Sequence, residues 1–296
     1  MLISKKSSIF APAFCMTDLM NNILTGKRGI IFGALDERSL AWHVAQRCVE
    51  AGASIVLTNT SQAIQLGSVG QLAKTHSLPL IACDATNTED LAHLWQETRA
   101  VLGGEVDFIL HACAQSMNLR RHKTYEEMNY EYYRQTLDIS AISLHKILRT
   151  ASEADMLAEG ASVVALSYIA SERYFADYND MADAKGLLEQ IARQMGAIYG
   201  RQKGVRINIV SQSPTRTKAG SQWREMEFFY DYSDALSPLG NADADDCADV
   251  CVALFSDLMR KVTMQTIYCD GGFGRTVITP EIRESYRKVK DERVKG

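Results

Sequence analysis

The sequence predicts an α/β protein with a Rossmann-like, doubly wound, seven-stranded parallel sheet flanked by helices on both faces. From Gly26 onward, short runs rich in β-branched residues alternate with longer amphipathic runs, as repeated βαβ units require. The short runs are almost continuously apolar, which is typical of strands that helices cover on both sides. We expect strands at residues 28–33, 53–58, 78–83, 106–111, 161–167, 205–210 and 265–269.

The longer runs between these strands carry the spacing of helices. In the first of them, apolar residues recur every three or four positions and stop before Gly52: Leu40, Ala41, Val44, Ala45, Cys48 and Val49. Similar patterns predict helices at about 62–75, 88–101, 126–152, 179–200 and 242–259. Thr88, with Asp90 nearby, offers a side-chain cap for the third of these helices.

Length and composition fit one compact domain. The chain has 296 residues, of which 46% are hydrophobic, and this is enough to build a buried core. We assign residues 26–275 to a single domain, because no repeat or Gly/Ser-rich linker interrupts them. Residues 1–25 read as a mobile N-terminal extension. Residues 276–296 form a highly charged tail, either a solvated helix or a contact for a partner.

Charge and cysteine content exclude several classes of function. A net charge of −4 provides no field that would hold nucleic acid. Seven cysteines without a C-x-x-C pair argue against a zinc site or a disulfide framework, and they favour a reducing cytoplasm. No run approaches the ~18 consecutive apolar residues of a membrane-spanning helix. We therefore expect a cytoplasmic protein that binds neither a metal, nor a membrane, nor nucleic acid.

The end of the first strand is a candidate anion site. Residues 33–40 (GALDERSL) lead from the strand into a helix, where free backbone amides and the helix dipole favour a pyrophosphate. Only Gly33 is present of the three glycines usual in this turn, so an ordinary strand-to-helix turn explains the pattern about as well.

A tyrosine and a lysine give a stronger signal. Tyr178 and Lys185 lie seven residues apart near the start of a predicted helix, so about two turns bring both side chains to one face. The phenol can donate a proton or a hydrogen bond to a carbonyl oxygen, and a nearby ammonium favours its phenolate form and can reach ribose hydroxyls. Chance spacing is the alternative, but the pair follows the fifth predicted strand where such a site is expected.

These residues resemble the short-chain dehydrogenase/reductase superfamily over nearly all of residues 26–275. Within it, five ordered segments are similar to bacterial NADH-dependent enoyl-acyl carrier protein reductases. The segments are GKRGIIFGALDERSLAWHVA at 26–45, LDISAIS at 137–143, SYIASERYFADYNDMADAK at 167–185, VRINIVSQSPTRTKAGS at 205–221 and CDGGF at 269–273. The third segment is the most specific, because Tyr168 stands ten residues before Tyr178, where ordinary members of the superfamily use a serine nearby.

The resemblance implies hydride transfer from NADH to the β-carbon of a trans-2-enoyl thioester in fatty-acid elongation. It assigns Tyr178 as donor to the thioester oxygen, Lys185 to the nicotinamide ribose, and Tyr168 to the site beside the substrate. Met181 becomes a pocket wall, although core packing would explain it equally well. The cofactor contacts carried over are Gly33, Ser39 and Leu40 for the pyrophosphate, Asp84 and Ala85 for the adenine, Ala112 and Cys113 under the ribose, and Thr215 and Thr217 beside the nicotinamide.

The second strand bears on the choice of cofactor. It ends in Thr58, Asn59, Thr60 and Ser61, without the acid that pairs with a ribose 2′-hydroxyl and without an arginine for a 2′-phosphate. The absence of a basic residue makes NADPH the less favoured cofactor, and we expect NADH.

Partners follow from the same resemblance. The acyl carrier protein is small and acidic, and residues 117–127 supply Arg120, Arg121, His122 and Lys123 as a landing site, although a solvated loop is the common role of such a run. The resemblance also implies a homotetramer. Residues 215–230 contain Trp223, Met226, Phe228 and Phe229, which form either an apolar lid or fixed core.

Three departures from the family pattern leave alternatives open. His43 is harmless if it faces outward and crowds the first turn if it faces inward, and Ala176 stands where proline is frequent. Ala114 and Gln115 alter the pocket mouth, so a paralogous reductase acting on another carbonyl or conjugated molecule is the alternative function. A non-catalytic dinucleotide-binding subunit is a third hypothesis, against which the intact Tyr178 and Lys185 count.

Overall fold

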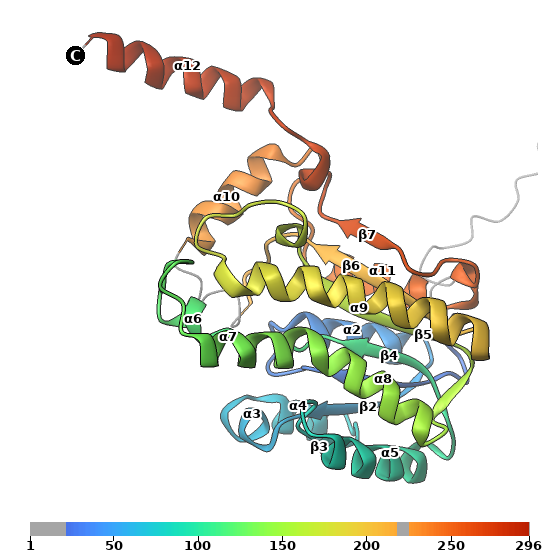
Figure 1. Cartoon of the computed structure of the whole chain (residues 1–296). Helices are drawn as coiled ribbons and strands as arrows, with labels where there is room; N and C mark the ends of the chain where they lie inside the picture. The colour runs from blue at the N-terminus through green and yellow to red at the C-terminus, as the bar shows by residue number, and fades with distance from the viewer. Residues whose placement is uncertain (1–21, 218–224, 296) are drawn as a thin grey trace, which may run out of the picture.

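The predicted seven-stranded parallel sheet is confirmed. A computed structural model describes residues 22–217 and 225–295 (Figure 1). All strands pair in parallel, in the order β3-β2-β1-β4-β5-β6-β7. Their bounds are β1 Arg28–Phe32, β2 Ser54–Asn59, β3 Leu80–Ala82, β4 Val106–His111, β5 Leu157–Ser167, β6 Arg206–Gln212 and β7 Thr266–Cys269.

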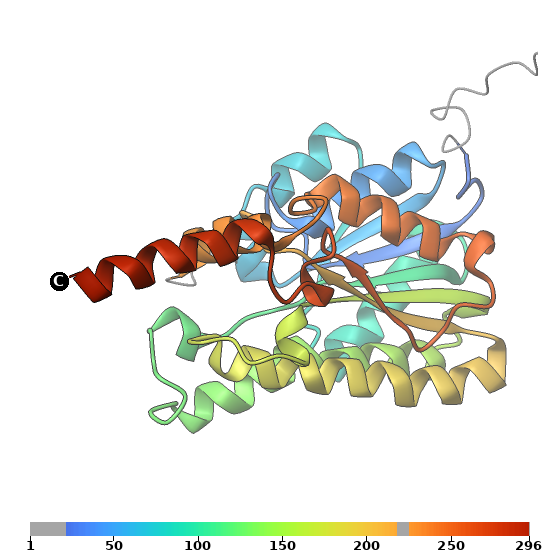
Figure 2. The same cartoon turned by 90° about the horizontal axis from the view of Figure 1, so that it is seen from above.

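Helices cover both faces of the sheet, as the continuous apolar strands predict (Figures 1 and 2). On one face, Trp95 of α5, Leu148 of α8 and Leu188 of α9 join one buried cluster. On the other, Val44 of α2 and Val252 of α11 join a second. The helix bounds are α2 Leu40–Glu50, α3 Ser61–Leu66, α4 Val69–Thr75, α5 Thr88–Leu102, α6 Met117–Arg120, α7 Tyr130–Leu137, α8 Ser143–Glu153, α9 Asn179–Lys203, α10 Met226–Leu236, α11 Ala244–Phe255 and α12 Pro280–Lys295.

The helix expected at 62–75 is divided in two, α3 and α4. Gly67 lies between them, and a Cβ added there would sit 2.5 Å from the Leu35 carbonyl oxygen. The Val69 amide donates to the same oxygen at 3.0 Å. The break therefore comes from close backbone contact with the loop after β1, which the periodicity of the segment does not reveal.

The helix expected at 126–152 runs without a break from Tyr130 to Glu153 but changes its winding in the middle. A π-helical segment, Asp138–Ile142, separates α7 from α8. Such a segment adds one residue to a turn and occurs mostly at functional sites. The apolar spacing continues across it, so the sequence predicts the long helix but not the π-helical turn within it.

The predicted cap of α5 is wrong by one residue. Asn87, not Thr88, precedes the helix, and its side chain accepts hydrogen bonds from the amides of Glu89 and Asp90. The Asp90 carboxylate instead accepts from the Asp84 amide at 3.1 Å. Asn87 and Asp90 thereby fix the loop that follows β3.

The two ends of the described chain differ in how they meet the fold. Leu24 is fully buried and its amide donates to the Ala51 carbonyl at 2.8 Å. Residues 22–25 therefore pack against the domain, although the sequence assigned them to the N-terminal extension. The remainder of that extension lies outside the described residues. The charged tail contains α12, which reaches away from the sheet (Figure 1). Within the described ranges, no helix has both the length and the hydropathy to cross a membrane.

Candidate functional site

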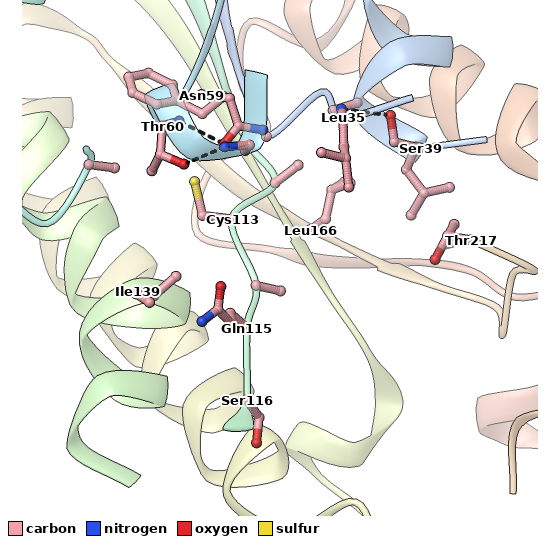
Figure 3. A pocket seen from close by; sticks show the side chains of 18 of the residues that line it. Leu35, Ser39, Asn59, Thr60, Cys113, Gln115, Ser116, Ile139, Leu166 and Thr217 are labelled. Carbon is pink, nitrogen blue, oxygen red and sulfur yellow. Dashed lines mark hydrogen bonds between the residues drawn. The ribbon is translucent and has the colours of Figure 1, made fainter. Parts of the chain in front are cut away.

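A cleft of about 1030 Å³ lies at the carboxyl ends of the strands, where β1 and β4 are neighbours and the chain leaves them in opposite directions. Ligands of doubly wound folds bind at this kind of switch point. Figure 3 shows its lining, with Leu35, Ser39 and Thr60 near one end and Gln115 and Ser116 near the other. Its volume is at the upper end of the ~300–1,000 Å³ typical of ligand pockets, so the cleft has room for a dinucleotide and a second molecule.

Gly33 shapes the first turn of the cleft. Its φ of +100° lies in the region that glycine adopts without steric cost. A Cβ at this position would lie 2.5 Å from the Ala112 carbonyl oxygen. Gly33 thus allows the end of β1 to lie directly against the end of β4, and it brings two of the predicted cofactor positions together.

Ser39 stabilises the turn itself rather than the helix after it. Its hydroxyl donates to the Asp36 carbonyl at 2.7 Å and accepts from the Leu35 amide at 3.2 Å. It makes no side-chain cap for α2, and the first turn of α2 carries no acidic residue. The start of α2, at Leu40, therefore keeps the positive end of its dipole facing the cleft.

The end of β2 is tied to this turn by side chains that the sequence did not mark as structural. The Asn59 amide donates to the Ala34 carbonyl at 2.9 Å, and Thr60 caps α3 by accepting from the Ala63 amide. Both residues line the cleft (Figure 3). Their role could have been recognised from the residue types, because Asn and Thr are favoured in turns and caps.

The remaining predicted cofactor residues also line the cleft. Asp84 Oδ1 accepts from the Thr86 amide and hydroxyl at 2.8 and 2.7 Å, so this carboxylate also shapes its own loop. Cys113 faces the cleft, and burial raises the pKa of its thiol to about 12. The other lining positions in this group are Ala85, Ala112, Thr215 and Thr217.

A serine in the π-helical segment holds the loop that follows β4. Ser140 Oγ accepts from the Gln115 amide at 3.0 Å and lies 3.3 Å from the Gln115 carbonyl oxygen. Ile139, the residue before it, lines the cleft. Sequence reasoning noted the segment 137–143 as a motif but missed this contact, because the π-helical turn that aims Ser140 is not visible in the periodicity.

Tyr178 and Lys185 both line the cleft, with Tyr178 at the start of α9 and Lys185 two turns later. The Lys185 ammonium is buried and donates to the Leu166 carbonyl at 2.8 Å. Burial lowers the pKa of Lys185 to about 8 and raises the pKa of Tyr178 well above its ordinary value. The expectation that the ammonium would favour the phenolate is therefore wrong, because desolvation of the phenol dominates.

Tyr168 packs beside Tyr178, with their ring centroids 5.4 Å apart. Its hydroxyl is buried and has no hydrogen-bond partner among the described residues. A buried hydroxyl normally has a partner, so this one is an exception to the usual pattern. Met181 is 5% exposed and lines the cleft, a position that fits either a pocket wall or a core side chain.

Two open alternatives are decided by the packing. His43 faces outward, where Nδ1 lies 2.8 Å from Asp245 Oδ1, and leaves the first turn uncrowded. Met226 and Phe229 of the expected lid are buried in the cluster around Tyr168, whereas Phe228 is 65% exposed. Trp223 lies outside the described residues.

Comparison with known proteins agrees with this geometry. The sequence model of the family described as enoyl-(acyl carrier protein) reductase matches residues 33–274. The chain belongs to this family. It is 30% identical over 260 residues to the enoyl-[acyl-carrier-protein] reductase [NADH] 2 of Rhizobium meliloti, covering 87% of this chain and 95% of that one.

Solved structures of the family share the whole fold. The FabI–NADH complex from Alistipes finegoldii is 53% identical and superposes with a TM-score of 0.86, covering 87% of this chain and 91% of that one. A second FabI structure from the same organism is 49% identical, with a TM-score of 0.85 and coverage of 91% and 98%. The resemblance inferred from the five sequence segments is thereby confirmed.

Proposed function

We propose that the protein reduces the trans-2 double bond of enoyl thioesters on acyl carrier protein, with NADH as hydride donor, in fatty-acid elongation. The observation that carries this proposal is the position of Tyr178, Tyr168 and Lys185 in the same cleft as the Gly33 turn. Membership of the enoyl-(acyl carrier protein) reductase family supports the reaction. The similarity to a FabI–NADH complex supports the cofactor.

The cleft fits a dinucleotide. The Gly33 turn forms a cradle that any Cβ would fill, and α2 begins beside it without an acidic side chain. Helix starts of this kind bind pyrophosphates. We assign the pyrophosphate to Gly33, Ser39 and Leu40, the adenine to Asp84 and Ala85, the riboses to Ala112, Cys113 and Lys185, and the nicotinamide side to Thr215 and Thr217.

The charges around β2 favour NADH over NADPH. Asn59 and Thr60 use their side chains to hold local backbone, and the acidic Asp36 and Asp84 line the same end of the cleft. A 2′-phosphate there would carry about two negative charges. The basic side chains that line the described cleft, Arg120 and Lys185, come from α6 and α9 instead.

The protein's own residues then stabilise charge on the substrate. When bound, NADH supplies the hydride that reduces the double bond. Tyr178 stays protonated because burial raises the pKa of its phenol, so it can donate a hydrogen bond to the thioester oxygen as negative charge develops there. Lys185 contributes positive charge while it is protonated, and Tyr168, whose ring packs against that of Tyr178, would lie beside the substrate.

We also propose a contact for the carrier protein, a state of assembly and a location in the cell. An acidic carrier protein would contact the exposed residues Arg120–Lys123, and Arg120 itself lines the cleft. The family resemblance supports a homotetramer, and Ile198 of α9 is 47% exposed on the outer surface of one copy. Six cysteines within the described ranges are free thiols, which supports a location in the reducing cytoplasm.

Replacing Gly33 tests the dinucleotide assignment. Gly33→Ala should weaken NADH binding at least about tenfold, because the new methyl group must displace the Ala112 carbonyl. The measurement is a titration of NADH fluorescence. Gly103→Ala is the matched control, since Gly103 also has a positive φ of +73° but no atom within 4 Å of the added Cβ. Equal affinity of the Gly33 and Gly103 variants would refute the assignment.

Replacing Tyr178 tests the proposed reaction. Tyr178→Phe should lower kcat on the order of 10²- to 10³-fold, as loss of one donor to a developing oxyanion does, and leave NADH affinity unchanged. The assay follows NADH absorbance after addition of crotonyl thioester. Tyr174→Phe, four residues earlier and 92% exposed, is the control. Wild-type turnover in the Tyr178 variant, or no NADH consumption by the unaltered protein, would contradict the proposal.

The buried lysine predicts a pH dependence. Its pKa of about 8 means that the charged form is lost as pH rises through that value, so kcat/KM should fall above about pH 8. Tyr178 titrates at higher pH and does not account for this limb. Lys185→Arg keeps its charge and should move the limb to higher pH, even with a lower rate. If kcat/KM falls at the same pH in the unaltered protein and in the Lys185→Arg variant, Lys185 is not the origin of the fall.

Charge reversal tests the carrier-protein contact. Arg120→Glu with Arg121→Glu should raise KM for carrier-bound substrate by roughly tenfold and leave a coenzyme A thioester nearly unaffected. Arg260→Glu with Lys261→Glu reverses another exposed adjacent pair, which precedes β7 at the amino ends of the strands, and serves as control. The same change in KM for both substrates would contradict the proposed contact with the carrier protein.

A further inference from the structure

A buried carboxylate near the start of α9 connects the proposed catalytic tyrosine to the wall of the cleft. Asp180 is the second residue of α9 and is fully buried. Its Oδ1 accepts from the Ser116 hydroxyl at 2.6 Å, and its Oδ2 accepts from the Asn118 amide at 2.8 Å. The Thr136 hydroxyl lies 2.9 Å from Oδ2 and shares its one hydrogen with the Tyr132 carbonyl. A buried charge is tolerated only when it is satisfied in this way.

The donors belong to one segment, residues 116–136, which we call the cleft wall. It contains α6 and most of α7, and side chains from it line the cleft, including Met117, Leu119 and Gln135. Ser116 leads out of β4 at the substrate end of the cleft (Figure 3). Asp180 therefore bonds the wall on one side of the substrate to the helix that presents Tyr178 and Lys185 on the other.

The turn that carries Tyr178 needs this support. Asp177 and Asn179, on either side of it, have φ values of +59° and +43°, in the left-handed region that residues other than glycine rarely adopt and that Asp and Asn tolerate best. Such conformations persist only where surrounding contacts hold them. The side-chain amide of Asn179 donates to the Lys123 carbonyl, so the cleft wall holds this turn at a second point.

We propose that Asp180 is a positioning residue of the reductase: it fixes the cleft wall against α9 and so sets where Tyr178 meets the thioester oxygen. Asp180 does not line the cleft itself and acts through Ser116, Asn118 and Thr136. The β1–α2 and β2–α3 turns, which hold the nucleotide, make none of these hydrogen bonds. The inference rests on the proposed role of Tyr178, and it assigns the substrate step, not NADH binding, to the Asp180 network.

The test is Asp180→Asn, which keeps the shape but replaces one acceptor by an N–H donor. If the amide oxygen faces Ser116, its NH2 group opposes the NH2 group of Asn118; if it faces Asn118, its NH2 group faces the Ser116 oxygen, and the Ser116 hydrogen loses its carboxylate acceptor. We expect kcat/KM for crotonyl thioester to fall on the order of 10- to 100-fold, the effect of losing one hydrogen bond to a buried charge. NADH affinity should stay within about twofold of the unaltered protein, because the Gly33 turn is untouched and Lys185, further along α9, is held by its own bond to the Leu166 carbonyl.

A matched control and a reciprocal exchange separate positioning from general loss of structure. Asp183→Asn makes the same change one turn later, where the donors are the Tyr125 and Tyr133 hydroxyls, at 3.1 and 3.0 Å, and an amide oxygen can still accept from them. It should retain activity. Asn118→Asp in the Asp180→Asn protein restores a donor opposite an acceptor between these two side chains. It should recover only part of kcat/KM, because it also removes the bond from the Asn118 side chain to the Asn129 carbonyl at 3.1 Å. Asn118→Asp alone opposes two carboxylates.

Each outcome is decisive. Unchanged kcat/KM in Asp180→Asn, or a parallel loss of kcat/KM and NADH affinity without recovery in the double variant, overturns the proposal. If Asp180→Asn does not fold, Thr136→Val removes a single donor at constant shape and should show the same selective loss, smaller in size. Absence of enoyl reduction in the unaltered protein would instead refute the proposed function, whatever Asp180 does.

Discussion

The close approach of β1 to β4 is the constraint on which the rest of the site depends. The two strand ends meet where Gly33 lies against the Ala112 carbonyl, and the next segments turn away to opposite faces of the sheet. This separation opens the crevice and directs the start of α2 into it. A side chain at position 33 would push the strand ends apart, so a single missing Cβ links the topology of the sheet to its ability to hold a dinucleotide.

The second half of the site depends on burial. α9 carries Tyr178 and Lys185 into the cleft, and removal from water shifts both pKa values toward the neutral forms. The phenol is thereby kept as a hydrogen-bond donor, and the ammonium is brought close to the pH at which it loses its proton. The same helix is anchored through Asp180 to the wall opposite, so electrostatics and geometry are set by neighbouring turns of one element.

Much of this could be predicted from the sequence, because the strands are defined by local pattern. Seven apolar runs predicted seven strands, and a Tyr-x6-Lys spacing predicted two side chains that do line one cleft. The assignment of residues 26–275 to one domain and the roles of the individual site residues stay predictions.

What the sequence did not predict depends on contacts between distant segments. The break at Gly67 comes from Leu35, the π-helical turn at Ser140 serves Gln115, and Asp180 bonds to residues more than forty positions earlier. The direction of the Tyr178 pKa shift was also missed, because spacing reveals a neighbouring charge but not the depth of burial. Periodicity describes one element at a time, so properties that arise between elements need the fold.

The most direct test of the central claim is a crystal structure of the protein with NADH and an unreactive analogue of a crotonyl thioester. The account predicts the nicotinamide beside Lys185, with the Tyr178 hydroxyl about 2.6–3.2 Å from the thioester oxygen. A nicotinamide bound elsewhere, or a Tyr178 hydroxyl directed away from that oxygen, would contradict it.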